Sequence, residues 1–345
     1  MTSFLRGLLY AAVVIGLSGC ASERAAGPSA PPQPAPSPAQ VVQDALGLTS
    51  VHTSDGRPAT WDEVVSRSRL ADVVVIAELH GHPIGLSAAA ALWRSLLDVK
   101  GVRPALALEF FGRDDQSRID DYLTSPPLVT EEVFLRRTGK TTTPGAEAWA
   151  GGYPPGHRDM VEAARAAQPP APVIAANAPR QYVRLARTAG YAALANLTHE
   201  QQRLFVLPAF AADGARPENR YWVDFLAFMN TTPEKYRNAD AAEREKADSM
   251  FRAQSVWDAT MADSVRQTLA RGYAPVVLVI GQFHADFADA GGGGTVQALK
   301  AVRPETRIVV ISFQDVDPAA QFRDQDRGRA DFVVYTGSGS VSPVR

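Results

Sequence analysis

The chain has 345 residues, 46% of them hydrophobic and 21% charged, so it is long enough to bury a large core in one or two domains. With 35 basic residues against 37 acidic ones, it lacks the basic excess that is typical of nucleic-acid-binding proteins. Beyond the N-terminus, no run of about 18 apolar residues predicts a membrane span.

Residues 1–19 predict a secretory signal peptide, because Arg6 precedes an apolar stretch that ends at Leu17 and small residues follow. The letters LSGC, ending at Cys20, resemble the lipobox of bacterial lipoproteins, in which cleavage precedes the cysteine and its thiol is acylated. A short uncleaved membrane anchor is the alternative. Lipid on Cys20 would hold the protein on a membrane of the cell envelope. By similarity to Gram-negative sorting rules, Ala21 favours the outer membrane, facing the periplasm.

Cys20 is the single cysteine of the chain. Once it is acylated, the mature domain has no thiolate, which excludes cysteine nucleophiles, iron–sulfur clusters and cysteine-ligated zinc. Residues 20–40 are rich in Pro, Ala and Ser and predict an extended, disordered tether. The folded domain is expected over residues 41–340.

Short apolar runs alternate with helical patterns through this domain, after a capping box that begins at Thr60. The runs are continuous and rich in β-branched residues, as in strands of a parallel sheet covered on both faces. They are residues 73–77, 105–108, 173–176, 276–280, 308–311 and 332–334. Helical patterns lie between them, for example at residues 87–99, 158–167 and 253–270. The predicted fold class is α/β, with a mainly parallel sheet flanked by helices.

Residues 178–271 differ from the rest because they contain amphipathic helical patterns and no strand pattern. Thr198 and Gln201 supply a second capping box within this stretch. We therefore expect an all-helical insertion between two strands, covering the edge of the sheet where a site would lie.

Polar side chains follow four of the predicted strands, at the sheet edge where open α/β folds bind ligands. Glu78 and His80 follow the first strand, Glu109 the second, Arg180 the third and His284 the fourth. Each carboxylate could be a buried group that accepts backbone hydrogen bonds, and each histidine a satisfied interior residue. Because they follow neighbouring strands, we expect the Glu and His side chains to form one functional cluster.

The other histidines have structural interpretations. His82 is expected in a turning loop with an exposed ring, because Pro83 follows it. His157 and His199 begin predicted helices.

Glutamate and histidine side chains suit two kinds of chemistry, and their spacing leaves both open. They could bind a divalent metal such as zinc or manganese, or act as general acids and bases without metal. The chain contains no HExxH, P-loop, GxGxxG or GxSxG motif. Gly291 to Gly294 precede a predicted helix over residues 295–301 and form either a flexible loop or an anion-binding helix N-terminus.

Five motifs occur in an order that resembles the ChaN-like haem-binding lipoproteins. They are ADVVVIAELHGHP, LALEFFGRDDQ, VIAANAPRQYVRLAR, AQSVWDATMA and VLVIGQFHADF. The resemblance covers roughly residues 41–335 and extends to a superfamily with the Tiki and TraB proteins and the erythromycin esterases. It implies an α/β fold with a helical subdomain, haem binding linked to iron uptake, and a homodimer around haem. The superfamily's enzymes imply the alternative, an esterase-like or protease-like hydrolase that is in some cases metal-dependent.

The resemblance also assigns roles to individual residues. It implies that Glu78, His80, Glu109 and His284 are the catalytic or metal-binding residues of a hydrolase. It places Asp258 and Arg180 on the same cavity.

For the iron of haem, the resemblance leaves Tyr153, His157, Tyr221 and Tyr335 as candidate ligands. The aromatic stretch NRYWVDFLAFM, residues 219–229, could supply an apolar wall for haem or form the core of a helix.

Overall fold

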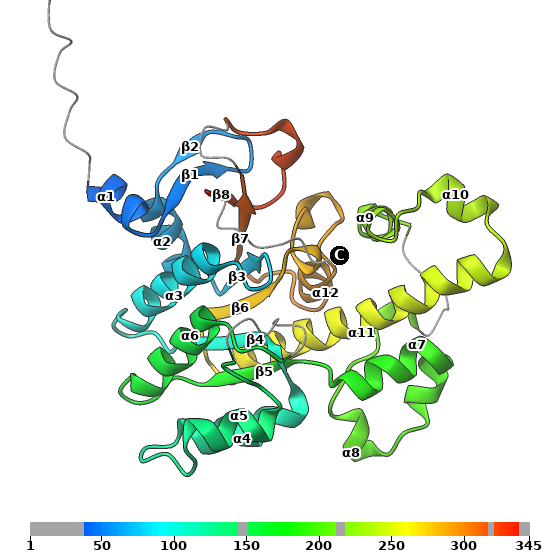
Figure 1. Cartoon of the computed structure of the whole chain (residues 1–345), viewed down its shortest axis with the longest axis horizontal. Helices are drawn as coiled ribbons and strands as arrows, with labels where there is room; N and C mark the ends of the chain where they lie inside the picture. The colour runs from blue at the N-terminus through cyan, green and yellow to red at the C-terminus, as the bar shows by residue number, and fades with distance from the viewer. Residues whose placement is uncertain (1–37, 144–150, 212–217, 317–320, 338–345) are drawn as a thin grey trace, which may run out of the picture. The chain divides into compact units, whose positions relative to one another are not determined.

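The computed structural model describes residues 38–143, 151–211, 218–316 and 321–337 (Figure 1). One eight-stranded sheet runs through these residues in the order β2-β1-β8-β7-β3-β6-β4-β5. The strands are β1 (Leu48–Thr53), β2 (Pro58–Ala59), β3 (Val73–Glu78), β4 (Ala105–Gly112), β5 (Val173–Asn177), β6 (Val276–Gly281), β7 (Ile308–Asp315) and β8 (Phe332–Thr336).

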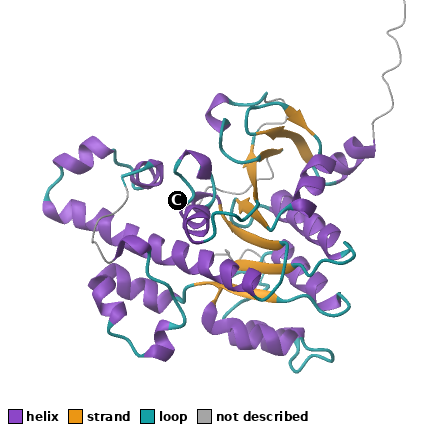
Figure 2. Ribbon diagram, turned by 180° about the vertical axis from the view of Figure 1, so that it is seen from behind, coloured by secondary structure: helices purple, strands orange, loops and turns teal. Residues whose placement is uncertain are grey.

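All six predicted strands are present, and from β8 to β5 each pairs in parallel with its neighbours. Strand β3 lies between β7 and β6, and all six of its residues are buried. Helices cover both sides of the sheet (Figure 2). The unbroken runs of Val and Ile follow from this burial, because neither face of the central strands meets water.

Two strands, β1 and β2, were not predicted from the sequence. β1 pairs antiparallel with both β8 and β2, so these two strands extend one edge of the sheet. The letters of β1, LTSVHT, mix polar and apolar residues, and β2 has two residues, which is too short for a periodic pattern. The prediction of a mainly parallel sheet is confirmed, with an antiparallel edge added.

Five helices share one apolar core with one face of the sheet. Buried Trp93, Phe134 and Met160 pack in the same cluster as Val74 and Leu106 of the strands. The helices are α2 (Trp61–Leu70), α3 (Pro83–Leu97), α4 (Gln116–Leu123), α5 (Glu131–Thr138) and α6 (Pro155–Ala166). The predicted capping box begins α2.

The opposite face of the sheet is covered by α11 (Ala241–Ala270) and α12 (Gly294–Val302). Met261 and Val265 of α11 share a core with Val296 of α12 and with the alternate side chains of β3 and β6. Helix α11 has 30 residues and contacts α7, α12 and the sheet, so it ties the helical part of the chain to the strands.

Within the described residues, every element between β5 and β6 is a helix, which confirms the predicted all-helical insertion. These elements are α7 (Arg180–Ala195), α8 (His199–Gln202), a 3-10 turn (Ala209–Ala211), α9 (Arg220–Phe228), α10 (Pro233–Asn238) and α11. The capping box of Thr198 and Gln201 begins α8, as predicted.

Residues from Ser37 onward form one compact unit, which carries every apolar core described above. Its first helix, α1 (Pro38–Ala45), begins three residues before the predicted start of the domain and inside the predicted tether. The predicted signal peptide, Cys20 and the tether up to residue 37 lie outside the described residues. None of the described helices is long and apolar enough to span a membrane.

Candidate functional site

Strands β3, β6 and β4 are neighbours in the sheet, and their carboxyl ends bring the predicted polar side chains together. Glu78 is the last residue of β3, and Glu109 lies near the end of β4. His284 ends the 3-10 turn that follows β6. These residues, with Asp258 of α11 and His157 of α6, form what we call the carboxylate–imidazole cluster (Glu78, His80, Glu109, His157, Asp258 and His284).

Glu78 forms the first half of the cluster with two imidazoles. Its Oε1 accepts a hydrogen bond from Nδ1 of His80 at 2.9 Å, and its Oε2 accepts one from Nε2 of His157 at 3.0 Å. Burial would raise the pKa of Glu78, but the charge and hydrogen bonds of His157 and His80 outweigh it and lower the pKa to about 2. Glu78 is therefore an ionised carboxylate in a buried place.

His80 has the opposite shift. Burial would lower the pKa of its ring, but the hydrogen bond that the ring donates to Glu78 and the charges of Glu109 and Glu78 outweigh this and raise it to about 9. The His80 side chain is 53% exposed, whereas those of His157 and His284 are 3% and 6% exposed. His80 is thus the imidazole of this cluster that solvent can reach.

His157 reaches Glu78 because α6 packs very closely on α3. Gly156 lies against Leu86, and a Cβ at Gly156 would come within 2.5 Å of the Leu86 Cβ. The prediction that His157 lies at the start of a helix is correct, since it is the third residue of α6. Its membership of the cluster was not predicted from the sequence, because the contact depends on this helix packing.

Glu109 lies between the two halves of the cluster. Its Oε2 accepts a hydrogen bond from the backbone N–H of Gly281 at 2.7 Å, and its Oε1 lies 3.8 Å from Nε2 of His284. A Cβ at Gly281 would lie 2.7 Å from Nε2 of His80. A glycine at the end of β6 therefore gives His80 and Glu109 the room to approach each other.

Asp258 forms the second half. Its Oδ1 accepts hydrogen bonds from Nδ1 of His284 and the hydroxyl of Thr295, each at 2.7 Å. Its Oδ2 accepts one from the Tyr221 hydroxyl at 2.5 Å. Burial would lower the pKa of His284, but the charges of Asp258 and Glu109 raise it above the usual value. Burial and Asp258 hold the pKa of Tyr221 well above 10, so the phenol keeps its proton.

The glycine run that ends with the first residue of α12, Gly294, explains how Asp258 fits. A Cβ at Gly294 would come within 2.3 Å of Oδ2 of Asp258, so the carboxylate lies against the first turn of α12. Negative charge is stabilised at a helix N-terminus. The sequence left open whether this run is a flexible loop or an anion site. In the structure, the anion at this helix is the side chain of Asp258.

Tyr153 and Tyr335, two of the candidate haem ligands, are both buried. The Tyr153 ring stacks on Phe110 with ring centres 5.5 Å apart, and its hydroxyl has no hydrogen-bond partner among the described residues. Tyr335 lies in β8, where its hydroxyl donates to Asp326 at 2.6 Å and its ring contacts His52. Tyr335 therefore belongs to the antiparallel edge of the sheet rather than to the cluster.

The surroundings of His82 differ from the prediction, and Arg180 lies at the surface. The expectation of an exposed His82 ring is wrong: the side chain is buried and accepts a hydrogen bond from the backbone N–H of Gly85, which caps α3. Arg180 is the first residue of α7, with an exposed side chain whose charge acts on Lys140. That Arg180 lines the same cavity stays a prediction; the strand that precedes it, β5, is the edge strand beside β4.

The arrangement can hold and move protons. Glu109 lies beside two imidazoles whose pKa values are raised, so a carboxylate base and protonated acids meet at one place. No group of three or more His, Asp or Glu side chains in the described part of the chain is arranged to hold a metal ion. Sequence reasoning had left metal binding and acid–base work open, and the raised imidazole pKa values suit acid–base work.

The hydrogen bond between Glu78 and His80 leads to a prediction. In a Glu78→Gln variant the pKa of His80 should fall from about 9 toward its ordinary value of about 6.5, because the carboxylate that stabilises the charged ring is removed. Titration of the imidazole carbon-bound protons by NMR measures this value. The exposed His199 serves as an internal control, because its imidazole signals should be the same in both proteins. A His80 that still titrates near pH 9 in the variant would contradict the assignment.

Residues 64–299 match the family described as "Haem-binding uptake, Tiki superfamily, ChaN". No curated protein matches the sequence.

Among solved structures, ChaN of Campylobacter jejuni, described with cofacial haem binding, is similar with a TM-score of 0.54 and 13% identity. The match covers 83% of this chain and 95% of that one. An erythromycin esterase, a variant of EreC in its open conformation, gives a TM-score of 0.42 at 14% identity over 78% of each chain. At these identities the likeness concerns the fold alone. Because the family match spans well over half of its length, the chain belongs to the haem-binding uptake family of the Tiki superfamily, ChaN.

Proposed function

We propose that this protein binds haem in the cell envelope, is held on a membrane by lipid on Cys20, and takes part in haem or iron uptake. The observation that carries the proposal is the family match over residues 64–299, which includes Glu78, His80, Glu109, Asp258 and His284. The lipid anchor rests on the lipobox-like sequence that ends at Cys20.

The cluster contains a side chain that is suited to bind iron. His80 combines a half-exposed ring with an Nδ1–H that donates to a carboxylate, which is the usual arrangement of a metal-binding imidazole. Of the candidates from the sequence, Tyr153, His157, Tyr221 and Tyr335 are all buried. His80 is therefore the residue that we expect to bind the iron of haem. Haem would then be the cargo of an uptake protein.

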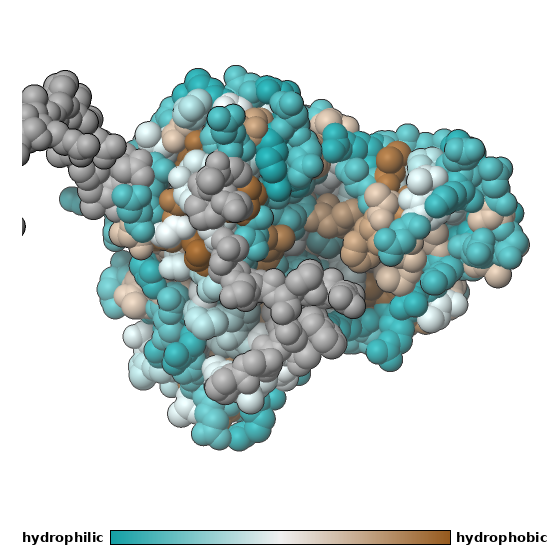
Figure 3. All heavy atoms as spheres, turned by 45° about the horizontal axis from the view of Figure 1, so that its top comes forward, coloured by the Kyte–Doolittle hydropathy of each residue, from teal (hydrophilic) through white to brown (hydrophobic). Residues whose placement is uncertain are grey.

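Two further features support a haem site near the cluster. The buried Nδ1 of His157 and hydroxyl of Tyr153 both lack hydrogen-bond partners among the described residues, and both rings contact Phe110. On α9, Val223 is 44% exposed and Phe228 is 63% exposed, and the Phe228 ring contacts Phe283, next to His284. Apolar colour gathers over the helices of the insertion in Figure 3. Residues 219–229 were predicted as either a haem wall or a helix core. In the structure, α9 has apolar side chains on both its buried and its exposed side.

A second candidate function is hydrolysis. The observation that favours it is the chain of contacts from Asp258 through His284 to Glu109, with Glu109 17% exposed. Glu109 could take a proton from an attacking water, while the protonated rings of His80 and His284 stabilise negative charge that develops on a carbonyl. The two functions use the same cluster and need not exclude each other.

Haem binding is tested by titrating residues 37–345 with hemin and following the Soret band. We expect saturable binding at micromolar hemin, and a loss of about 10- to 100-fold in affinity for His80→Ala and for Glu78→Gln. Because the His80 ring binds iron only after losing its extra proton, affinity should rise between pH 7 and pH 9.

A His199→Ala variant removes an exposed histidine elsewhere and should bind hemin like the unaltered protein. Absence of a saturable Soret change would reject haem binding, whereas a normal change in His80→Ala would reject only the ligand. Light scattering during the titration should show the mass doubling if two copies meet around haem.

The lipid anchor is tested by growing cells with radiolabelled palmitate. The full chain should carry label and fractionate with the envelope, whereas Cys20→Ser should lose the label because no thiol remains to be acylated. Label that persists in the Cys20→Ser variant would contradict the anchor.

Hydrolysis is tested with p-nitrophenyl acetate as a simple ester. Glu109→Gln and His284→Asn should each lower the rate at least about 100-fold if the cluster is catalytic, because each loses a proton-transfer group. An equal rate in these variants and in a His199→Asn control would show that the cluster does not catalyse this reaction.

A further inference from the structure

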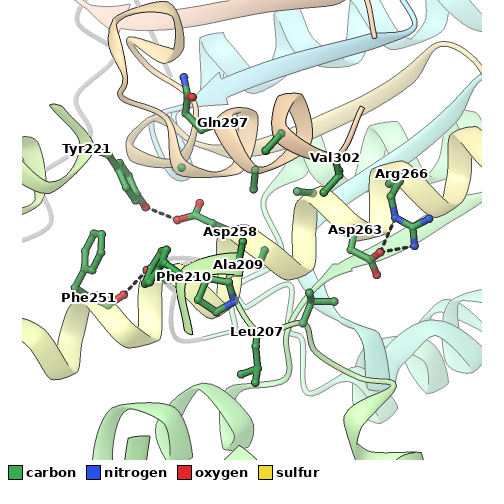
Figure 4. A pocket seen from close by; sticks show the side chains of 18 of the residues that line it. Leu207, Ala209, Phe210, Tyr221, Phe251, Asp258, Asp263, Arg266, Gln297 and Val302 are labelled. Carbon is green, nitrogen blue, oxygen red and sulfur yellow. Dashed lines mark hydrogen bonds and ion pairs between the residues drawn. The ribbon is translucent and has the colours of Figure 1, made fainter. Parts of the chain in front are cut away.

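A separate cavity of about 410 Å³ lies between α11, α12 and residues 206–210 (Figure 4). Its volume falls within the range of about 300–1,000 Å³ that is typical of small-molecule pockets. Asp258 is the one member of the carboxylate–imidazole cluster among its lining residues. The cavity thus begins behind the cluster and leads away from it.

Small side chains on two facing helices create this space. Ala259 and Ala262 of α11 and Ala298 and Ala301 of α12 line the cavity, and none of them reaches across it. Larger apolar groups, including Phe251, close the remaining walls. The alanines of both helices therefore account for the space.

The polar groups at the inner end of the cavity are already bonded to each other. The carboxylate of Asp258 accepts hydrogen bonds from Tyr221, His284 and Thr295, and the hydroxyl of Ser255 donates to the Phe251 carbonyl. A cavity whose polar atoms are satisfied holds water poorly and favours an apolar occupant.

The other end of the cavity carries positive charge. Asp263 accepts hydrogen bonds from both Arg266, at 2.6 Å and 2.9 Å, and Arg113, at 2.8 Å. Two guanidinium groups thus share one carboxylate, which leaves a net positive charge. Arg266 is 41% exposed and lines the cavity, so it can meet an anion at the entrance.

The lining of the cavity extends along much of α11. Its α11 lining runs from Phe251 to Arg266, which is about 22 Å along the helix at 1.5 Å per residue. In Figure 4, Tyr221 and Phe251 lie at one end and Asp263 and Arg266 at the other. A single extended chain suits a lining of this length.

We propose that this cavity binds a long-chain fatty acid, with its tail against Phe251 and Tyr221 and its carboxylate at Arg266. The inner end, whose polar atoms are already hydrogen-bonded, and the net positive entrance match the two ends of such a molecule. This site is distinct from the one that we propose for haem.

Equilibrium dialysis of residues 37–345 with radiolabelled palmitate tests the proposal. We expect saturable binding at micromolar palmitate. Ala298→Leu should lower the affinity at least tenfold, because leucine fills the space, while the thermal unfolding midpoint stays the same or rises. Arg266→Gln should weaken palmitate binding about two- to fivefold and leave hexadecanol binding unchanged, as expected for an exposed charge pair.

Arg69→Gln, which removes an exposed arginine from α2, is the matched control and should bind like the unaltered protein. Absence of saturable binding, or unchanged binding in Ala298→Leu, would overturn the proposal. Displacement of palmitate by dipalmitoyl phosphatidylcholine as readily as by palmitate would also overturn it, since it would show a two-chain site. Haem binding in the same preparation is measured separately by the Soret band, so the two sites can fail independently.

Discussion

The carboxylate of Asp258 holds together parts of the chain that are far apart in sequence. It comes from α11 and accepts hydrogen bonds from α9 through Tyr221, from the turn after β6 through His284, and from α12 through Thr295. Burying a charge is unfavourable unless it is fully hydrogen-bonded, and three donors satisfy this carboxylate. Its position against the first turn of α12 adds the stabilisation of a helix N-terminus. The helical insertion is thereby fixed to the end of the sheet where the other carboxylates lie.

Charge alternates through the cluster. The carboxylates of Glu78, Glu109 and Asp258 lie among three imidazoles, and each raised histidine pKa is caused by a neighbouring carboxylate. Because these charges depend on one another, each group keeps its protonation state only while the other groups are in place. His80 is the member at the surface, so a ligand or substrate from solvent meets the cluster there. This one exposed imidazole is common to the haem and the hydrolysis proposals.

Much of this fold could be predicted from the sequence, and the reasons are local. The six parallel strands are continuous apolar runs, and both capping boxes lie where their letters predict helices. Glu78, Glu109 and His284 could be expected together because parallel strands end at the same edge. The edge strands β1 and β2 have no such pattern and were missed.

The contacts of the site that depend on tertiary packing could not be predicted in this way. His157 reaches Glu78 through the close packing of α6 on α3, and Thr295 reaches Asp258 through the position of α12. His82 was expected to be exposed because it precedes a proline, but it caps a buried helix start. Arg180 follows a strand, as expected, yet that strand is the edge strand of the sheet. Order along the chain indicated which strands end near each other, and helix packing decided which side chains meet.

The bonds to Asp258 also connect motion in the insertion with acidity. If α9 moves away and exposes Asp258 to water, the solvent screens the negative charge that raises the pKa of His284, and this pKa falls toward its ordinary value. Opening of the insertion and release of a proton from His284 are therefore linked events. The charged His284 ring stabilises the closed state most below about pH 6.5, where the ring is charged in both states. This stabilisation is lost as the pH rises through the higher pKa of the folded form. We therefore expect these helices to loosen at alkaline rather than at acidic pH.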